Sequence, residues 1–222
     1  MNTTDNQPHA DALARDLTVG VIGLGTMGHG IAQAFAVGGY TVRAIDERPD
    51  TADSALTRIT SNLEQLTTVG LLNAEQIPDV LGRITVCDTL EETVTGTGLV
   101  TEAAWENLDV KQGLLRQIEP LVDEHTILAS NSSSFPISET ARDLAHPQRA
   151  VVTHWFNPPH VIPVVEVVGG ERTSDQTVNT ALATLESIGK TAVRIDKELA
   201  GFLVNRVQVA MFREVFDLLD RG

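Results

Sequence analysis

The sequence predicts an α/β fold, a doubly wound, Rossmann-like and mostly parallel sheet. Three observations support this prediction. Apolar runs of strand length alternate along the chain with longer segments of helical period. The runs are apolar throughout, as in strands that are covered on both faces. A glycine-rich loop follows the first run and precedes a helical segment, the order found in dinucleotide-binding domains.

The predicted elements follow one another in strand-helix order. Strands are predicted at 18–22, 41–46, 84–87, 98–103, 126–130, 150–155, 164–168 and 191–195. Helices are predicted at 27–39, 51–70, 107–118, 137–145, 173–189 and about 202–219. In the last helix, apolar residues recur every three or four positions and form an apolar stripe: Leu203, Val207, Met211, Val215 and Leu218.

The chain divides into three predicted segments. Residues 1–16 are polar and acidic and are expected to form a flexible tail. Residues 17–199 form the α/β domain, and residues 200–222 form the first helix of a C-terminal helical domain that is largely absent. The apolar stripe has two interpretations. It packs on the α/β domain, or it belongs to the helical domain and is an exposed or interface surface.

Composition limits the classes of partner. With 30 acidic and 16 basic residues the formal net charge is −14, which repels the phosphates of nucleic acids. No uninterrupted apolar run reaches a membrane span and the N-terminus lacks the regions of a signal peptide, so we expect no membrane partner and a cytoplasmic location. The single cysteine, Cys87, is expected to be an inert buried thiol. The sequence contains no cluster of His and Cys residues that could bind a metal, so we expect no metal site.

The first loop carries a dinucleotide-binding pattern. Gly23, Gly25 and Gly28 form G-x-G-x-x-G directly after a predicted strand, with Thr26 and Met27 inside the loop. The first glycine permits a tight turn, the second lets a pyrophosphate approach the backbone, and the third allows close packing of helix and strand. We therefore expect this loop to bind the cofactor. The alternative is an ordinary glycine-rich turn.

An acidic residue completes this pattern. Asp46 ends the second predicted strand, about 20 residues further on, where a carboxylate can accept hydrogen bonds from the adenosine ribose hydroxyls. The same charge repels a 2′-phosphate, so NAD is preferred over NADP, although Arg48 could reduce that repulsion. The alternative is an aspartate that caps a helix.

A single carboxylate interrupts a later apolar strand. Glu166 lies within VVEVV, where an unpaired charge would be costly to bury. His154 ends the preceding strand, at the carboxyl edge where ligands bind in α/β sheets, and is the expected partner. If Glu166 accepts one ring N–H, the other nitrogen is free to act as general acid or base. The alternative is a structural histidine.

A polar segment follows another strand at the same edge. The segment ASNSSSFPIS contains Asn131, Ser132, Ser133 and Ser134. These side chains are expected either to face a ligand or to form a polar turn that caps a helix beginning near Ser138. Both interpretations can hold for different serines.

Five segments together resemble the 3-hydroxyacyl-CoA dehydrogenase family, which includes relatives acting on small hydroxy acids such as carnitine dehydrogenase and gulonate 3-dehydrogenase (lambda-crystallin). They are GVIGLGTMGHGIA, EAAWENLDVKQGLLRQIE, ILASNSSSFPI, HWFNPPHVIPVVEVV and GFLVNRV, and they occur in this order over about residues 18 to 212. The resemblance implies hydride transfer between a carbinol carbon and NAD, with a proton exchanged at a histidine.

The resemblance also implies roles for individual residues. His154 would be the acid/base with Glu166 as its partner, while Ser133 and Asn205 would hydrogen-bond the substrate oxygen. The implied contacts with NAD come from four further residues: Asp46, Glu106, Lys111 and Asn131. Without the resemblance, Glu106 and Lys111 would be interpreted as a solvated pair on a helix. The family also implies a homodimer formed through the C-terminal helical region.

The substrate has two interpretations, a 3-hydroxyacyl-CoA or a small 3-hydroxy acid. The loop FNPPHVIP differs from the form typical of the acyl-CoA enzymes. Residues 49–110 contain only Arg58 and Arg83 as basic groups for the phosphates of CoA. His160 could contact a substrate carboxylate or be a plain surface histidine. The alternative function is an NAD-binding module without turnover, or a split subunit whose helical domain is supplied elsewhere.

Overall fold

The computed structural model describes residues 11–222 and contains an eight-stranded sheet in the order β3-β2-β1-β4-β5-β6-β7-β8. The strands are β1 (Thr18–Ile22), β2 (Thr41–Ile45), β3 (Ile84–Val86), β4 (Thr97–Glu102), β5 (Ile127–Ser130), β6 (Ala150–Trp155), β7 (Val164–Val168) and β8 (Thr191–Ile195). Strands β1 to β6 are parallel, and β7 is antiparallel to β6 and parallel to β8. The predicted Rossmann-like, mostly parallel sheet is confirmed.

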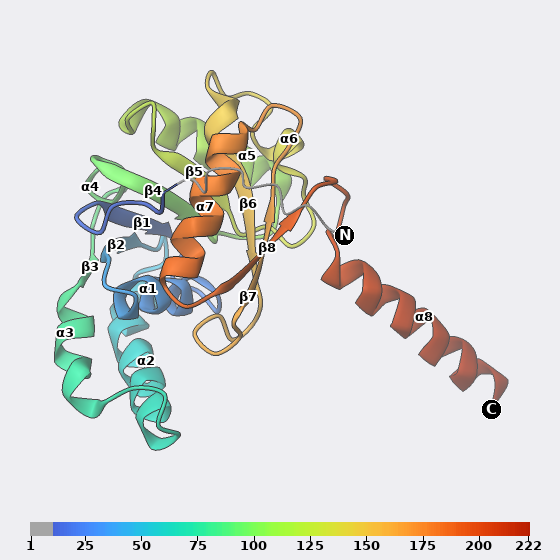
Figure 1. The fold of residues 1–222 in the computed structure, drawn as a ribbon, viewed down its shortest axis with the longest axis horizontal. Helices are drawn as coiled ribbons and strands as arrows, with labels where there is room; N and C mark the ends of the chain where they lie inside the picture. Colours follow the sequence, from blue (N-terminus) through green and yellow to red (C-terminus); the bar gives the residue numbers. More distant parts are fainter. Residues whose placement is uncertain (1–10) are drawn as a thin grey trace, which may run out of the picture.

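Helices connect these strands (Figure 1). They are α1 (Gly28–Val37), α2 (Pro49–Thr68), α3 (Ile77–Gly82), α4 (Leu90–Val94), α5 (Leu108–Ile118), α6 (Ile137–Thr140), α7 (Asp175–Ser187) and α8 (Val204–Arg221). Short 3-10 segments occupy Ala74–Gln76, Glu119–Leu121 and Pro147–Arg149. Asn107 caps α5 and Ser174 caps α7 through side chains that accept backbone N–H bonds. The sequence did not predict α3 or α4, and α6 is shorter than predicted.

Helices cover both faces of the sheet. One apolar core joins α1, α2 and α7 to the sheet and includes Phe35 and Ile59. The other joins α4, α5 and α6 to the opposite face and includes Leu115 and Leu128. Because both faces are covered, the central strands are apolar throughout, as the sequence pattern indicated.

The segment before β1 is docked on the domain. Of the tail expected over residues 1–16, residues 1–10 lie outside the described residues. The Leu13 N–H donates to Thr184 Oγ1 at 2.9 Å, and the Tyr40 hydroxyl donates to the Leu13 carbonyl at 2.6 Å. The Arg15 guanidinium lies 4.3 Å from the centre of the Tyr40 ring and donates to the Ser187 carbonyl at 2.6 Å. Residues 13 and 15 of the predicted tail therefore contact the domain.

Helix α8 extends away from the rest of the molecule (Figure 1). Every member of its apolar stripe is exposed. The interpretation in which the stripe packs on the α/β domain is therefore wrong. The helix is joined to the domain at its start, where Phe202 is buried in the core formed with α4, α5 and α6.

Three further observations concern Cys87, membrane spans and metal sites. Cys87 is half-buried, so the predicted burial of its thiol is wrong. Within residues 11–222, no helix combines the length and the hydrophobicity required to cross a membrane. The same residues contain no group of three or more His, Cys, Asp or Glu side chains arranged to hold a metal ion.

Candidate active site

The glycine loop between β1 and α1 is shaped by two glycines and left open at the third. Gly23 has φ of 89°, and a Cβ there would lie 2.7 Å from the Ala103 carbonyl oxygen. A Cβ on Gly28 would lie 1.6 Å from the Gly23 carbonyl oxygen. A Cβ on Gly25 would have no atom within 4 Å. Gly23 and Gly28 are therefore required by packing, whereas Gly25 borders open space that a ligand can enter.

The start of α1 provides donors for an anion. Met27 occupies the N-cap position and makes no side-chain cap, so the first N–H groups of α1 are free of a capping side chain. Met27 is half-buried against the core, and Thr26 is exposed at the loop surface. These features fit the pyrophosphate of a dinucleotide.

Asp46 is oriented toward this loop. Its Oδ2 accepts the Leu24 N–H at 2.6 Å, and its Oδ1 accepts the Arg48 N–H at 2.9 Å. The Arg48 guanidinium pairs with Asp50 at 2.7 Å, and this hydrogen bond and the Asp50 charge raise the pKa of Arg48. The Arg48 guanidinium thus forms its ion pair with Asp50 and not with Asp46.

Arg58, for which sequence reasoning gave no role in the loop, holds the glycine loop from α2. Its guanidinium donates to the Leu24 carbonyl at 2.8 Å and to the Thr51 carbonyl at 2.9 Å. His29 Nδ1 lies 2.6 Å from the Gly25 carbonyl. Burial lowers the pKa of His29. The hydrogen bond that the Gly25 carbonyl accepts raises this pKa, and the charge of Arg58 lowers it, so that the pKa lies below its ordinary value. No sequence signal identified the contact between Arg58 and Leu24, because these residues lie 34 positions apart.

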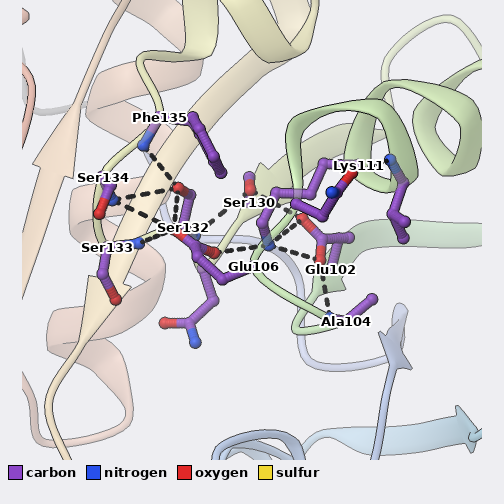
Figure 2. Close-up of polar contacts among 12 residues, drawn as sticks. Glu102, Ala104, Glu106, Lys111, Ser130, Ser132, Ser133, Ser134 and Phe135 are labelled. Carbon is purple, nitrogen blue, oxygen red and sulfur yellow. Dashed lines mark hydrogen bonds and ion pairs between the residues drawn. The ribbon is translucent and has the colours of Figure 1, made fainter.

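A buried ion cluster lies next to the serine segment (Figure 2). The Lys111 ammonium is 2.9 Å from Glu102 Oε1 and 3.1 Å from Glu106 Oε2. Glu102 also accepts the Ala104 N–H at 2.7 Å and the Ser130 hydroxyl at 2.8 Å. Sequence reasoning missed Glu102, although an acid at the end of the apolar run GLVTEA was a usable signal. Direct contact between Lys111 and NAD would have to compete with these two carboxylates.

Glu106 holds the serine turn. Its Oε1 accepts the Ser132 hydroxyl at 2.7 Å and the N–H groups of Ser133 at 2.9 Å and Ser134 at 3.2 Å. Burial raises the pKa of Glu106, but the hydrogen bond from Ser132 and the charge of Lys111 outweigh it, and the pKa lies below its ordinary value. Glu106 precedes α5 and Lys111 is buried, so the interpretation as a solvated helix pair is wrong.

The serine hydroxyls form a turn and do not cap α6. Ser132 Oγ accepts the Phe135 N–H at 2.8 Å, and Pro136 occupies the N-cap position of α6 without a side-chain cap. The turn interpretation therefore holds for Ser132, and the capping interpretation is wrong. Ser133 remains half-exposed at the carboxyl edge.

His154 and Glu166 lie directly opposite each other in the antiparallel pair β6–β7. His154 Nδ1 donates to Glu166 Oε2 at 2.7 Å, and the residues are only 4% and 1% exposed. Glu166 Oε1 accepts the N–H groups of Leu203 at 3.0 Å and Val204 at 2.9 Å, at the start of α8. Three donors thus satisfy the carboxylate within the apolar strand. Because a carboxylate only accepts, Nδ1 carries the hydrogen and Nε2 is left for a ligand.

Two asparagines link this pair to the serine turn. Asn131 Oδ1 accepts the backbone N–H of Trp155, the neighbour of His154, at 3.0 Å. Asn205 Nδ2 donates to the Ser133 carbonyl at 3.0 Å. Beside Asn205, a hollow of about 620 Å³ is lined by residues that include Ser134, Arg206 and Arg213. The residues predicted as catalytic thus form one connected site, and Asp46 lies apart from them at the glycine loop.

This arrangement defines a Rossmann-type dinucleotide-binding domain with an ionisable pair at the carboxyl edge of its sheet. A family model described as "3-hydroxyacyl-CoA dehydrogenase, NAD binding domain" matches residues 18–199. The chain belongs to the 3-hydroxyacyl-CoA dehydrogenase family. Its cofactor is NAD.

Similar proteins include dehydrogenases that are named for different substrates. The 5-formyl-3-hydroxy-2-methylpyridine 4-carboxylate 5-dehydrogenase of Mesorhizobium japonicum is 39% identical over 205 residues, which are 92% of this chain and 65% of that protein. The L-carnitine dehydrogenase of Streptomyces coelicolor is 37% identical over 204 residues, 92% of this chain and 63% of that protein. This chain therefore spans about two thirds of the length of these relatives.

A solved structure has the same fold. The crystal structure of (S)-3-hydroxybutyryl-CoA dehydrogenase from Ralstonia eutropha superposes with a TM-score of 0.88 at 36% identity. The match covers 93% of this chain and 72% of that chain.

Proposed function

We propose that this protein is an NAD-dependent dehydrogenase that interconverts a 3-hydroxyacyl group and its 3-keto form. The observation that carries the proposal is the buried His154–Glu166 pair, in which Nδ1 is bonded and Nε2 is left for a ligand. NAD, when bound, supplies the acceptor for the hydride that leaves the carbinol carbon. His154 Nε2 takes the hydroxyl proton in the oxidative direction and returns it in the reductive direction.

The remaining site residues orient the two reactants. Ser133 and Asn205 hydrogen-bond the substrate oxygen, and the bond from the Asn205 amide to the Ser133 backbone carbonyl at 3.0 Å holds the two residues side by side. Glu106 fixes the serine turn through three accepted hydrogen bonds, and Asn131 fixes the backbone beside His154. Asp46 and the glycine loop hold the cofactor, and Lys111 acts through Glu106.

The substrate is an anion, and a small 3-hydroxy acid fits the distribution of basic groups better than a CoA thioester. Arg58 and Arg83 are the two basic residues of the segment 49–110, and both donate to backbone carbonyls. They are therefore engaged within the protein instead of facing a phosphate. Arg206 and Arg213 line the hollow beside Asn205 and provide positive charge for a carboxylate in an otherwise acidic protein.

NADH absorbance tests the activity. The wild-type chain, His154→Ala and the control His125→Ala, whose side chain is exposed, are assayed with 3-hydroxybutyrate and with 3-hydroxybutyryl-CoA. General acid/base catalysis contributes about 10²–10⁴-fold, so we expect His154→Ala to lose that factor in kcat and to keep its affinity for NAD. Equal turnover by both variants would refute the proposal. Tight NAD binding without turnover by the wild-type chain would favour the alternative, a binding module or split subunit.

We also propose that the chain forms a homodimer through α8. The exposed apolar stripe along this helix supports an interface, because long apolar faces are rarely left in water. Sedimentation of the wild-type chain should give a dimer, and Met211→Glu should give a monomer. A monomeric wild-type chain would contradict this proposal.

A further inference from the structure

We propose that Phe202 is a positioning residue for the acid/base pair, a role that rests on the proposed function of His154. Phe202 lies directly before α8 and is only 2% exposed. Its ring centre is 5.5 Å from that of the His154 imidazole, with an angle of 51° between the planes. Phe156 contacts the same imidazole at 4.6 Å. Two aromatic rings thus restrict how the imidazole can turn.

The backbone of Phe202 is as unusual as its contacts. Among residues 11–222 it is the only non-glycine residue with positive φ, at 47°. Bulky side chains rarely adopt this left-handed conformation, which glycine adopts without cost. Gly201, directly before it, has φ of 75°. A phenylalanine held in this conformation indicates that its ring has a role in the site.

This left-handed turn delivers the start of α8 to Glu166. The next two residues, Leu203 and Val204, are the ones whose N–H groups donate to Glu166 Oε1. The linker between β8 and α8, residues 196–203, is held at a second point, where Glu198 accepts the Ser138 N–H at 2.9 Å. Phe202 therefore acts on both partners, since its ring contacts the imidazole and its backbone aligns two donors with the carboxylate. The imidazole ring stays oriented only while this turn is docked.

Two substitutions distinguish the effect of the Phe202 ring from the effect of its backbone conformation. Phe202→Leu keeps apolar bulk and loses the ring, whereas Phe202→Gly keeps the backbone conformation at no steric cost and loses the side chain. Phe216→Leu makes the same exchange at an exposed site on α8. Leu63→Ala lowers global stability from the core on the opposite face of the sheet.

The measured quantity is the exchange rate of the Nδ1 proton of His154 in the NAD-bound full chain, followed by NMR on ¹⁵N-histidine protein. The signal is assigned by its absence in His154→Gln. We expect exchange to quicken on the order of tenfold or more in both Phe202 variants, because local opening exposes the proton. Phe216→Leu should leave the rate unchanged. Affinity for NAD should stay at the wild-type value in every variant, which shows that the chain is folded.

The outcomes distinguish this inference from the proposed function. If Phe202→Gly is folded and the Nδ1 proton exchanges at the wild-type rate, Phe202 does not position the imidazole, whatever the activity. If exchange quickens equally in Leu63→Ala, the effect reports global stability and the inference is overturned. If His154→Gln retains wild-type turnover, the proposed function fails even where the Phe202 variants behave as expected.

Discussion

Replacing Lys111 by methionine removes the cation from the buried ion cluster. The Lys111 ammonium is 1% exposed and Glu102 is completely buried, so neither charge can be stabilised by water. Methionine keeps most of the apolar stem, and the packing loss is therefore small. The variant leaves the Glu102 carboxylate with the Ala104 N–H and the Ser130 hydroxyl as its partners, but without a compensating charge.

The expected loss follows from this uncompensated charge. Removing one partner of a buried ion pair costs about 3–5 kcal/mol of the free energy of unfolding. Glu106 adds little, because its side chain is 38% exposed and water screens its charge. For a chain of this size each kcal/mol lowers Tm by about 2–4 °C, which gives a decrease of about 6–20 °C.

Urea unfolding followed by circular dichroism measures the loss. Lys197→Met is the matched control, since Lys197 is exposed, and it should change the free energy of unfolding by less than about 0.5 kcal/mol. The double variant Glu102→Gln/Lys111→Met removes both charges and should lose about 0.5–3 kcal/mol less than the sum of the single variants. A loss in Lys111→Met below about 1 kcal/mol, as for a surface pair, would refute this account.

The remaining predictions concern pH and the cofactor loop. Burial is the largest cause that lowers the pKa of His29 and of His160 below 6.5. As pH falls below about 6.5, these histidines therefore bind protons in the unfolded chain before they do so in the folded chain, and the free energy of unfolding decreases. A His29→Asn/His160→Asn variant whose free energy of unfolding has the same pH slope would contradict this. Asp46→Asn should weaken NAD binding on the order of tenfold and narrow the preference over NADP, and an unchanged ratio of the two dissociation constants would contradict it. Gly25→Ala should keep the wild-type Tm, because a Cβ there meets no atom within 4 Å, yet bind NAD more weakly; unchanged NAD affinity would exclude cofactor contact at this position.

The periodic elements could be predicted from the sequence because their signal is local. The strand at 150–155 was predicted with the observed bounds, and so was β7. The short helices α3 and α4, with six and five residues, are too brief to establish a helical period. For α6, the pattern continues to residue 145, but the backbone leaves the helix after Thr140.

The site could be predicted only where a residue was anomalous in its own strand. Glu166 was such a residue, because a carboxylate in an apolar run requires a partner and the carboxyl edge supplied His154. Phe202 looks ordinary in sequence, and its burial depends on segments distant along the chain. It packs into the core formed with α4, α5 and α6. Such contacts have no local signal.

The direction of β7 explains how the His154–Glu166 pair forms. Because β7 is antiparallel to β6, its third residue, Glu166, lies beside the penultimate residue of β6, His154, on the same face of the sheet. That face also carries Phe202, which belongs to the core formed with α4, α5 and α6. The second carboxylate oxygen therefore meets the start of α8 instead of a strand or solvent. The donors that complete the pair come from residues 203 and 204, just beyond the 18–199 segment that the family model matches.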